Sequence, residues 1–129
     1  MSLDPARLPD SVIEFTRERH LATLTTLRRD GSPHVVPVGF TFDAATSTVR
    51  VITWATSVKT RHALLGGRAA VSQVDGGRWL TFEGPIRVSD DPADVADAVA
   101  RYTERYREPK KRDDRVVLVI DVDRVLGRA

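Results

Sequence analysis

The chain has 129 residues, a formal net charge of +2, 41% hydrophobic and 29% charged residues, and no Cys. This length predicts one domain, residues 1–129, with the composition of an ordinary globular protein and without disulfides, thiolate nucleophiles or Cys-type zinc sites. Aromatic residues make up only 6% and Arg residues are scattered among acids, which argues against nucleic acid and for small anionic ligands.

The N-terminus and the hydropathy pattern bear on location. The first ten residues, MSLDPARLPD, lack the basic-then-apolar order of a signal peptide. No apolar run approaches the roughly 20 residues that span a bilayer. We therefore expect a cytoplasmic protein without a membrane segment.

The chain opens with signals for a short helix and a β-hairpin. A helix is expected over Pro9–Arg19, where Asp10 or Ser11 can cap the first turn. A Thr-rich strand is expected over Leu21–Leu27. The Asp30-Gly31 pair that follows is typical of a hairpin turn.

The next segments predict strands around a second helix. The sequence PHVVPVGFTFD continues the hairpin, and Pro37 and Gly39 within it indicate an edge, a bulge or backbone that a ligand approaches. The alternation in TVRVITW, from Thr48, predicts a strand. A helix is then expected over Val58–Leu65, because Gly66-Gly67 ends it.

The second half of the chain predicts two more strands, a long helix and a final strand. Strands are expected over Ala69–Val74 and Trp79–Val88, the latter with a bend at Gly84-Pro85. Asp91-Pro92 starts an amphipathic helix, with Asp91 as its cap. Val116–Val122 is apolar on both faces, which predicts a central strand.

Six short strands, linked mainly by hairpin signals and with helices after the third and fifth, predict a mainly β fold. We expect a six-stranded antiparallel barrel with helical plugs.

The turn between Trp54 and Val58 is the best candidate for a binding site. A helix start has unpaired N–H groups and the positive end of a dipole, so the hydroxyls of Thr53, Thr56 and Ser57 and the ammonium of Lys59 would surround an anion. A phosphate fits such a place. Only three of the 20 basic residues are Lys, and Lys59 is the only one before residue 110. The alternative is a capped turn with a surface lysine and no ligand.

Other catalytic and metal chemistry finds no support in the sequence. His20, His34 and His62 are isolated, with no spacing typical of a metal site, and no Gly-x-Ser-x-Gly motif is present. We therefore expect no metal and assign no catalytic residue.

Three segments carry a resemblance to a known family. They are HLATLTTLRRDGSPHVVPVGFTFD, VRVITWATSVKTRHALLGGRAAVSQVDGGRWLTFEGPIRV and RYTERYREPKKRDDRVVLVIDVDRVLG, which lie within residues 10–127. In this order and spacing they resemble the split β-barrel flavin and deazaflavin oxidoreductases, the superfamily of pyridoxamine 5′-phosphate oxidase. Within it the chain is similar to the small actinobacterial reductases that use the deazaflavin coenzyme F420, including biliverdin-, aflatoxin- and coumarin-reducing members.

The resemblance implies a homodimer of FMN-binding-like split barrels with a cofactor site between the two chains. The phosphate of the cofactor would lie against the strand-turn-helix, at Arg50, Thr53, Thr56, Ser57 and Lys59. The ring system would lie near Pro37, Val38, Gly39, Ile52 and Trp54. Contributions from the partner chain would come from Gln73 and Trp79.

The implied activity is hydride transfer from reduced F420 to a conjugated C=C acceptor, such as an enone, an unsaturated lactone or a tetrapyrrole bridge. F420 and FMN share the ring, ribityl chain and phosphate, so the phosphate site does not distinguish them. The glutamyl tail of F420 favours further basic groups, which Lys59, Arg61 and the Lys110–Arg112 loop would supply. The alternatives are an FMN-binding protein related to pyridoxamine 5′-phosphate oxidase and a non-catalytic flavin or F420 carrier. Because the chain ends at DRVLGRA, without the Arg- and His-bearing segment that holds pyridoxamine phosphate in those oxidases, we do not expect that oxidation.

Overall fold

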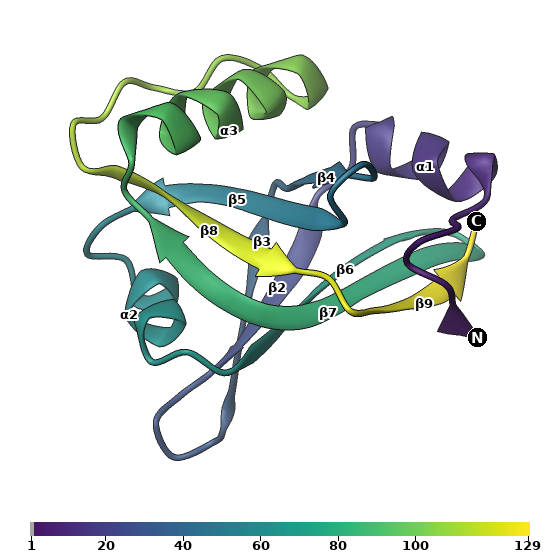
Figure 1. Cartoon of the computed structure of the whole chain (residues 1–129), viewed down its shortest axis with the longest axis horizontal. Coiled ribbons are helices and arrows are strands. Elements are labelled where there is room, and N and C mark those ends of the chain that lie inside the picture. Colours follow the sequence, from purple (N-terminus) through teal and green to yellow (C-terminus); the bar gives the residue numbers. More distant parts are fainter. Residues whose placement is uncertain (1) are drawn as a thin grey trace.

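The computed structural model describes residues 2–129, which form a system of antiparallel strands with three helices (Figure 1). The helices are α1 (Asp10–Arg17), α2 (Val58–Leu64) and α3 (Pro92–Arg105). The strands are β1 (Ser2–Leu3), β2 (Ala22–Leu27), β3 (Pro33–Val38), β4 (Thr41–Asp43), β5 (Thr48–Trp54), β6 (Arg68–Asp75), β7 (Arg78–Ser89), β8 (Arg115–Asp121) and β9 (Arg124–Arg128). The mainly β, antiparallel class is confirmed. No helix among residues 2–129 is long and apolar enough to cross a membrane.

The long strand β7 joins two parts of the sheet, whose strand order is β3-β2-β6-β7-β8-β5-β4. The first half of β7 pairs with β6 and β9, and the second half, from Ile86, pairs with β8. The partner changes next to Gly84-Pro85, where the backbone carbonyl of Asp121 occupies the space that a Cβ on Gly84 would need. The expected bend is therefore confirmed, and close backbone approach explains the glycine.

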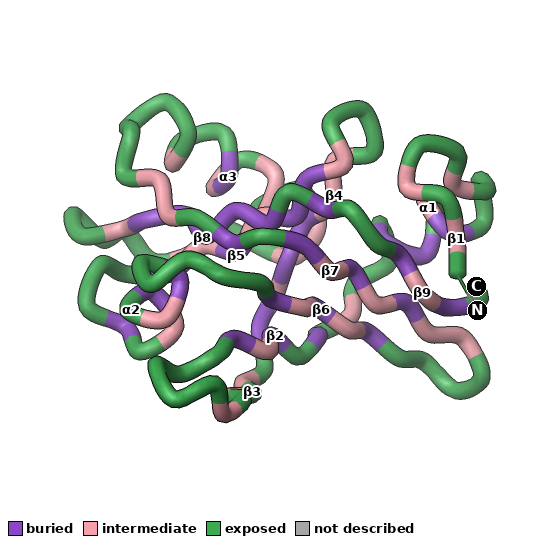
Figure 2. Tube along the Cα trace, turned by 60° about the horizontal axis from the view of Figure 1, so that its bottom comes forward, coloured by how far each residue is buried: buried purple, intermediate pink, exposed green. Residues whose placement is uncertain are grey.

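Both parts of the sheet turn their apolar faces toward one core. Leu24, Val71 and Phe82 face it from one side and Val49 and Ile120 from the other, all fully buried. Figure 2 shows the buried residues along the strands and the exposed ones in the loops. Along each strand, buried and exposed residues tend to alternate, because successive side chains point to opposite faces of the sheet. The outer face of β8 is also apolar because α3 covers it.

The structure departs from the expected elements in three places. The first helix begins after Pro9, and neither Asp10 nor Ser11 caps it with a side-chain hydrogen bond. The segment PHVVPVGFTFD forms two strands, β3 and β4, separated at Gly39-Phe40. Strands β1 and β9 were not expected, because they are short and pair with segments distant in the sequence.

The helices lie at different sides of the sheet (Figure 1). The helix α3 packs against β5 and β8, α2 against β7 and β2, and α1 against β4. Asp91 caps α3 as expected, since its carboxylate accepts a hydrogen bond from the Ala93 N–H at 2.8 Å.

Arg105 ties the last turn of α3 to three other segments. Its guanidinium donates hydrogen bonds to the carbonyl oxygens of Glu18 (2.9 Å) and Phe40 (2.6 Å), and to Oε1 of Gln73 (2.7 Å). No carboxylate neutralises it in residues 2–129, and burial lowers its pKa. The guanidinium thus fixes Phe40 and, next to it, Gly39 against α3.

We expect Arg105→Leu to lower the free energy of unfolding by roughly 1 to 3 kcal/mol, because the buried Gln73 oxygen loses its donor. The matched control is Arg101→Leu on the same helix, whose ion pairs with Asp43 and Asp97 involve partly exposed groups and are typically worth about 0 to 1 kcal/mol. Urea unfolding measures both variants. Equal losses would contradict the role assigned to Arg105.

Candidate functional site

The turn between β5 and α2 is held by a chain of hydroxyl groups. Thr53 donates to Oγ of Ser57 at 3.0 Å, and that oxygen also accepts from the Thr60 N–H at 3.2 Å. The Thr60 hydroxyl donates to the Trp54 carbonyl at 2.9 Å. Ser57 is thus the N-cap of α2. Thr53, Ser57 and Thr60 are all buried.

This network corrects the expected phosphate site. The hydroxyls of Thr53 and Ser57 form the turn and are not available to surround an anion. Thr56 is exposed and lines neither of the two pockets described below. What the turn offers an anion is therefore Lys59.

Lys59 is a half-buried cation without a countercharge. Its Nζ lies 4.9 Å from the centre of the Trp54 ring, and it makes no salt bridge within residues 2–129. Burial lowers the pKa of the Lys59 ammonium, since desolvation disfavours the charged form. The guanidinium of Arg112 lies 4.8 Å from the same Trp54 ring but is paired with Asp114 at 2.9 Å.

Lys59 lines a pocket of about 190 Å³ between the ends of β3 and β5, the start of α2, and α3. The structure brings together here seven of the residues expected to bind a cofactor: Pro37, Val38, Gly39, Ile52, Thr53, Trp54 and Lys59. Three further residues complete the lining: Tyr102, Pro109 and Arg115.

The three added residues carried weak signals in the sequence. Tyr102 belongs to the apolar stripe of α3, where a phenol is a polar group on a face otherwise built for packing. Arg115 is the first residue of β8, and in the sequence it indicates only where a strand begins. Only the packing of α3 and β8 beside β5 brings them to the pocket, so spacing in the sequence could not identify them.

Gly39 has a different role from the one expected. Its Cβ position faces two aromatic rings, with Cε2 of Tyr102 at 3.0 Å and Cε2 of Tyr106 at 3.1 Å. The absent side chain therefore makes room for α3, and any ligand approaches Gly39 from its other sides.

Two further expected cofactor residues lie away from this pocket. Arg50 is on the same face of β5 as Ile52, but it lies near Asp43 and Asp97, with N–O distances of 3.7 Å to each. These acids hold Arg50 beside β4 and α3. Gln73 is 1% exposed, and its side chain donates to the Phe15 carbonyl and accepts from Arg105. It faces the interior of its own chain and is not available to a partner.

Trp79, by contrast, faces outward on β7. It pairs with Val74 of β6 and Arg128 of β9 and is partly exposed. Its position leaves it available to a second chain.

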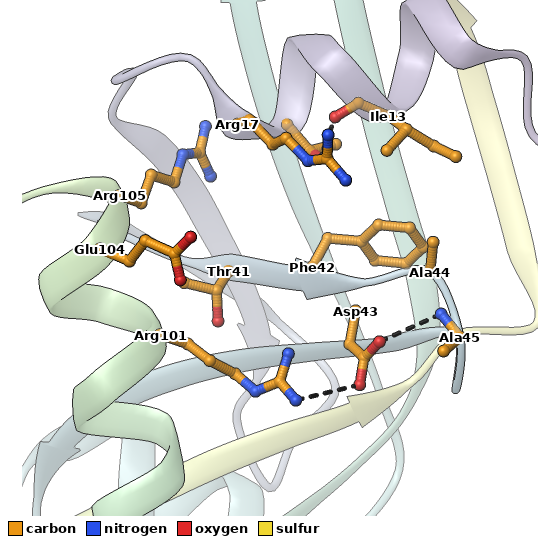
Figure 3. Close-up of a pocket in the computed structure, with 11 residues that line it drawn as sticks. Ile13, Arg17, Thr41, Phe42, Asp43, Ala44, Ala45, Arg101, Glu104 and Arg105 are labelled. Atoms are coloured by element: carbon orange, nitrogen blue, oxygen red, sulfur yellow. Dashed lines mark hydrogen bonds and ion pairs between the residues drawn. The ribbon is translucent and has the colours of Figure 1, made fainter.

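A larger pocket, of about 460 Å³, lies between α1, β4 and α3 (Figure 3). Its wall carries Asp43, which accepts from the Ala45 N–H at 3.0 Å and lies 3.4 Å from Arg101. The residues expected to bind a cofactor do not line it. Among its charged side chains Asp43 and Arg101 pair with each other, and Arg105 is hydrogen-bonded to Phe40 and Gln73.

One group of possible metal ligands occurs in residues 2–129: Glu18, His20 and Asp75. Arg78 already binds both carboxylates, at 2.8 Å from Glu18 and 2.6 Å from Asp75. The hydrogen bond from Arg78, and a second one from His20, lower the pKa of Glu18 to about 2. The group is therefore an ion-pair network that ties the end of α1 to the β6–β7 turn.

The smaller pocket combines apolar side chains with cations. Pro37 and Ile52 are the apolar side chains, Val38 lines the pocket beside them although its side chain belongs to the core, and Lys59 and Arg115 supply the charge. This arrangement suits a flat molecule with an anionic group.

Comparisons with known proteins show the family. The family model described as pyridoxamine 5′-phosphate oxidase matches residues 8–129. An F420H(2)-dependent biliverdin reductase of Mycobacterium tuberculosis (strain CDC 1551 / Oshkosh) is 53% identical over 123 residues, which cover 95% of this chain and 90% of that protein.

Two solved structures show the same fold at low sequence identity. A conserved hypothetical protein of Mycobacterium tuberculosis has a TM-score of 0.80 at 20% identity, covering 95% of this chain and 85% of the other. A protein titled F420 reductase has a TM-score of 0.75 at 23% identity, covering 92% and 98%. The match over residues 8–129 and the 53% identical relative place the chain in the pyridoxamine 5′-phosphate oxidase family.

Proposed function

We propose that the protein is an F420H2-dependent reductase of the cytoplasm that uses the small pocket to bind the coenzyme. The observation that carries this proposal is the unpaired, half-buried Lys59 beside Trp54 and the apolar side chains of the pocket. A phosphate would supply the countercharge that Lys59 lacks, and a tricyclic ring would pack against Pro37 and Ile52. The 53% identical F420H(2)-dependent relative supports F420 over FMN.

The bound coenzyme would supply a hydride, and the chain would supply binding, orientation and exclusion of water. Lys59 and Arg115 would hold the anionic end. The apolar side chains would hold the ring and keep it dry, which favours hydride transfer over side reactions. The acceptor would be a conjugated C=C system, such as an enone, an unsaturated lactone or a tetrapyrrole bridge.

The test is a titration of the protein with F420 and with FMN, followed by absorbance, and then turnover of menadione with reduced F420. We expect tighter binding of F420 than of FMN and oxidation of the coenzyme by the acceptor. Tighter binding of FMN would favour the flavin-dependent alternative. Binding of F420 without turnover of menadione or coumarin-type acceptors would favour a carrier.

We also propose that the active form is a homodimer, with the outer face of β3, β2, β6 and β7 as the interface. In the observed strand register this face presents mostly apolar and hydroxyl side chains: Thr23, Thr25, Leu27, Pro33, Val35, Pro37, Ala70, Ser72, Val74, Trp79 and Thr81. It also carries Glu83, which stands opposite Ala70 and is paired with Arg124, and Arg68 at the start of β6. Val35 and Val74 are 56% and 67% exposed. Exposed apolar patches of this kind are typical of interfaces.

A second copy would also complete the cofactor site. Pro37 belongs both to this face and to the lining of the small pocket. The pocket has about 190 Å³, whereas sites that enclose a whole ligand have about 300 to 1,000 Å³. One chain therefore offers part of a site, and the copy seated beside Pro37 would add the other wall.

The charged loop after α3 is the proposed contact for the glutamyl tail of F420. Arg112 lies over Trp54, and Arg115 donates to the Lys110 carbonyl at 2.6 Å. Replacement of Lys110, Lys111 and Arg112 by Ser should weaken the binding of F420 more than the binding of FMN, since only F420 has the glutamyl tail. The F420 loss should shrink with added salt, because exposed charges are screened over about 8 Å at physiological ionic strength.

A triple replacement of Arg7, Arg17 and Arg19 by Ser is the matched control, because it removes the same charge from a region that does not line the small pocket. It should leave both dissociation constants unchanged. If the dissociation constants of F420 and FMN rise equally in the loop variant, the loop does not contact the glutamyl tail.

A further inference from the structure

Tyr102 lies in the last turns of α3 and Tyr106 is the residue that caps the end of this helix, and their hydroxyl groups differ in their hydrogen bonds. The Tyr106 hydroxyl donates to the His20 carbonyl at 2.6 Å and accepts from the Phe40 N–H at 3.2 Å. The Tyr102 hydroxyl makes no hydrogen bond with residues 2–129, although the two ring centres are only 4.9 Å apart. Tyr106 is therefore part of the framework, and Tyr102 has an unused donor.

Tyr102 also lines the small pocket, and Gly39 allows it to do so. A Cβ on Gly39 would lie 3.0 Å from Cε2 of Tyr102, closer than carbon atoms pack without a shift. The backbone of Gly39 has no positive φ that would require glycine. The glycine is thus explained by the close approach of α3 to the end of β3, which puts Tyr102 beside the apolar side chains of the pocket.

The lining contains two hydroxyl residues, Thr53 and Tyr102. Thr53 donates to Ser57, so the phenol is the hydroxyl that remains for a ligand. Tyr102 is partly exposed, so water can hydrate it while no ligand is present. A hydroxyl group that water can reach suits a ligand that binds and dissociates at each turnover, because water replaces the ligand's hydrogen bond after the ligand leaves.

We propose that the Tyr102 hydroxyl donates a hydrogen bond to a carbonyl oxygen of the acceptor and so restricts the acceptors to those whose C=C bond is conjugated to a carbonyl. This proposal rests on the proposed reductase function and adds the specificity residue. A donor beside apolar side chains binds a carbonyl oxygen more strongly than water does. It also withdraws electrons from the conjugated carbon and stabilises charge that develops on the oxygen.

The experiment measures acceptor binding without turnover, using protein saturated with oxidised F420, which carries no hydride to transfer. The probes are coumarin and 2H-chromene, which share a fused bicyclic skeleton but differ in the lactone carbonyl. The parent protein should bind coumarin about ten-fold more tightly, the effect of one neutral hydrogen bond. Tyr102→Phe should remove this preference and leave the dissociation constant of F420 unchanged.

Tyr106→Phe is the matched control, because it removes a phenol one turn away whose hydrogen bonds are internal. It should lower the melting temperature and keep the preference for coumarin. The proposal is overturned if the parent shows no preference, if Tyr102→Phe keeps it, or if Tyr102→Phe weakens F420 instead, which would make the phenol a coenzyme contact. Failure of the parent to bind F420 would reject the proposed function itself, a result that the initial F420 titration shows separately.

Discussion

Lys59→Ala is expected to raise the dissociation constant of F420 about ten- to a hundred-fold. A charge-assisted contact with a phosphate is worth roughly 1.5 to 3 kcal/mol, at about 1.4 kcal/mol per decade. Turnover at saturating F420 should change much less, since the contact is the same in the ground and transition states. Titration followed by coenzyme fluorescence measures the affinity, and steady-state kinetics measure the turnover.

The stability of the protein without cofactor separates this site from a structural lysine. Because the Lys59 ammonium is half-buried without a countercharge, its loss should leave the melting temperature unchanged or slightly raised. Lys111→Ala, in the exposed loop, is the control for a general charge effect. A Lys59→Ala titration that overlays that of the parent would remove the phosphate site from this turn.

The lowered pKa of Lys59 adds a dependence on pH. Above the pKa of the free protein the site must take up a proton to bind the phosphate, so the affinity for F420 should fall with rising pH. This fall should begin below the ordinary lysine value of about 10.4. Lys59→Arg should stay charged and shift the fall to higher pH. An identical pH profile for both proteins would show that Lys59 does not titrate against the ligand.

Val35→Glu is expected to convert the proposed dimer to a monomer of 14.3 kDa and to weaken the binding of F420. Val35 lies opposite Thr25 on the edge strand β3 of the proposed interface, where a partner would bury the new carboxylate. Loss of roughly 100 Å² of apolar contact with the coenzyme, at about 25 cal/mol per Å², corresponds to about a hundred-fold in affinity. Sedimentation and fluorescence titration report the two effects.

Leu64→Glu provides the control, since Leu64 is 68% exposed on α2 and is not part of that face. It should stay dimeric and bind F420 as the parent does. A parent protein that sediments as a monomer and still binds F420 would reject the dimer, and a Val35→Glu variant that remains dimeric would place the interface elsewhere.

Local patterns determined most of the fold. The alternation in β5, the Asp-Gly turn before β3 and the Asp91-Pro92 start of α3 depend on neighbours within a few residues, so the sequence alone located them. Strands β1 and β9 depend on pairing across the chain, Ser2 with Leu126 and Trp79 with Arg128. Two to five residues carry too little periodicity to show such pairing in advance.

The site likewise combines local features, which the sequence predicts, with contacts between distant elements, which it does not. The sequence predicted a strand-turn-helix with a hydroxyl residue at the turn and Lys59 as its only lysine, because such patterns depend on neighbouring residues, and the structure shows that Ser57 is the cap. Whether a hydroxyl faces a ligand or a neighbour depends on packing, which directs Thr53 to Ser57. Packing also decides the role of Gln73, whose side chain forms hydrogen bonds with Phe15 and Arg105 of its own chain.

The sequence by itself thus determined most of the strand and helix pattern, the family resemblance and seven of the residues that line the pocket, Lys59 among them. The tertiary structure alone decided that Tyr102 and Arg115 join them, that Arg50 belongs to Asp43 and Asp97, and that Gly39 accommodates α3. These outcomes depend on contacts between elements far apart in the chain. Such contacts are set by how helices and sheets pack to bury apolar surface, and hydrogen-bonding groups then pair with whichever partners the packing brings near.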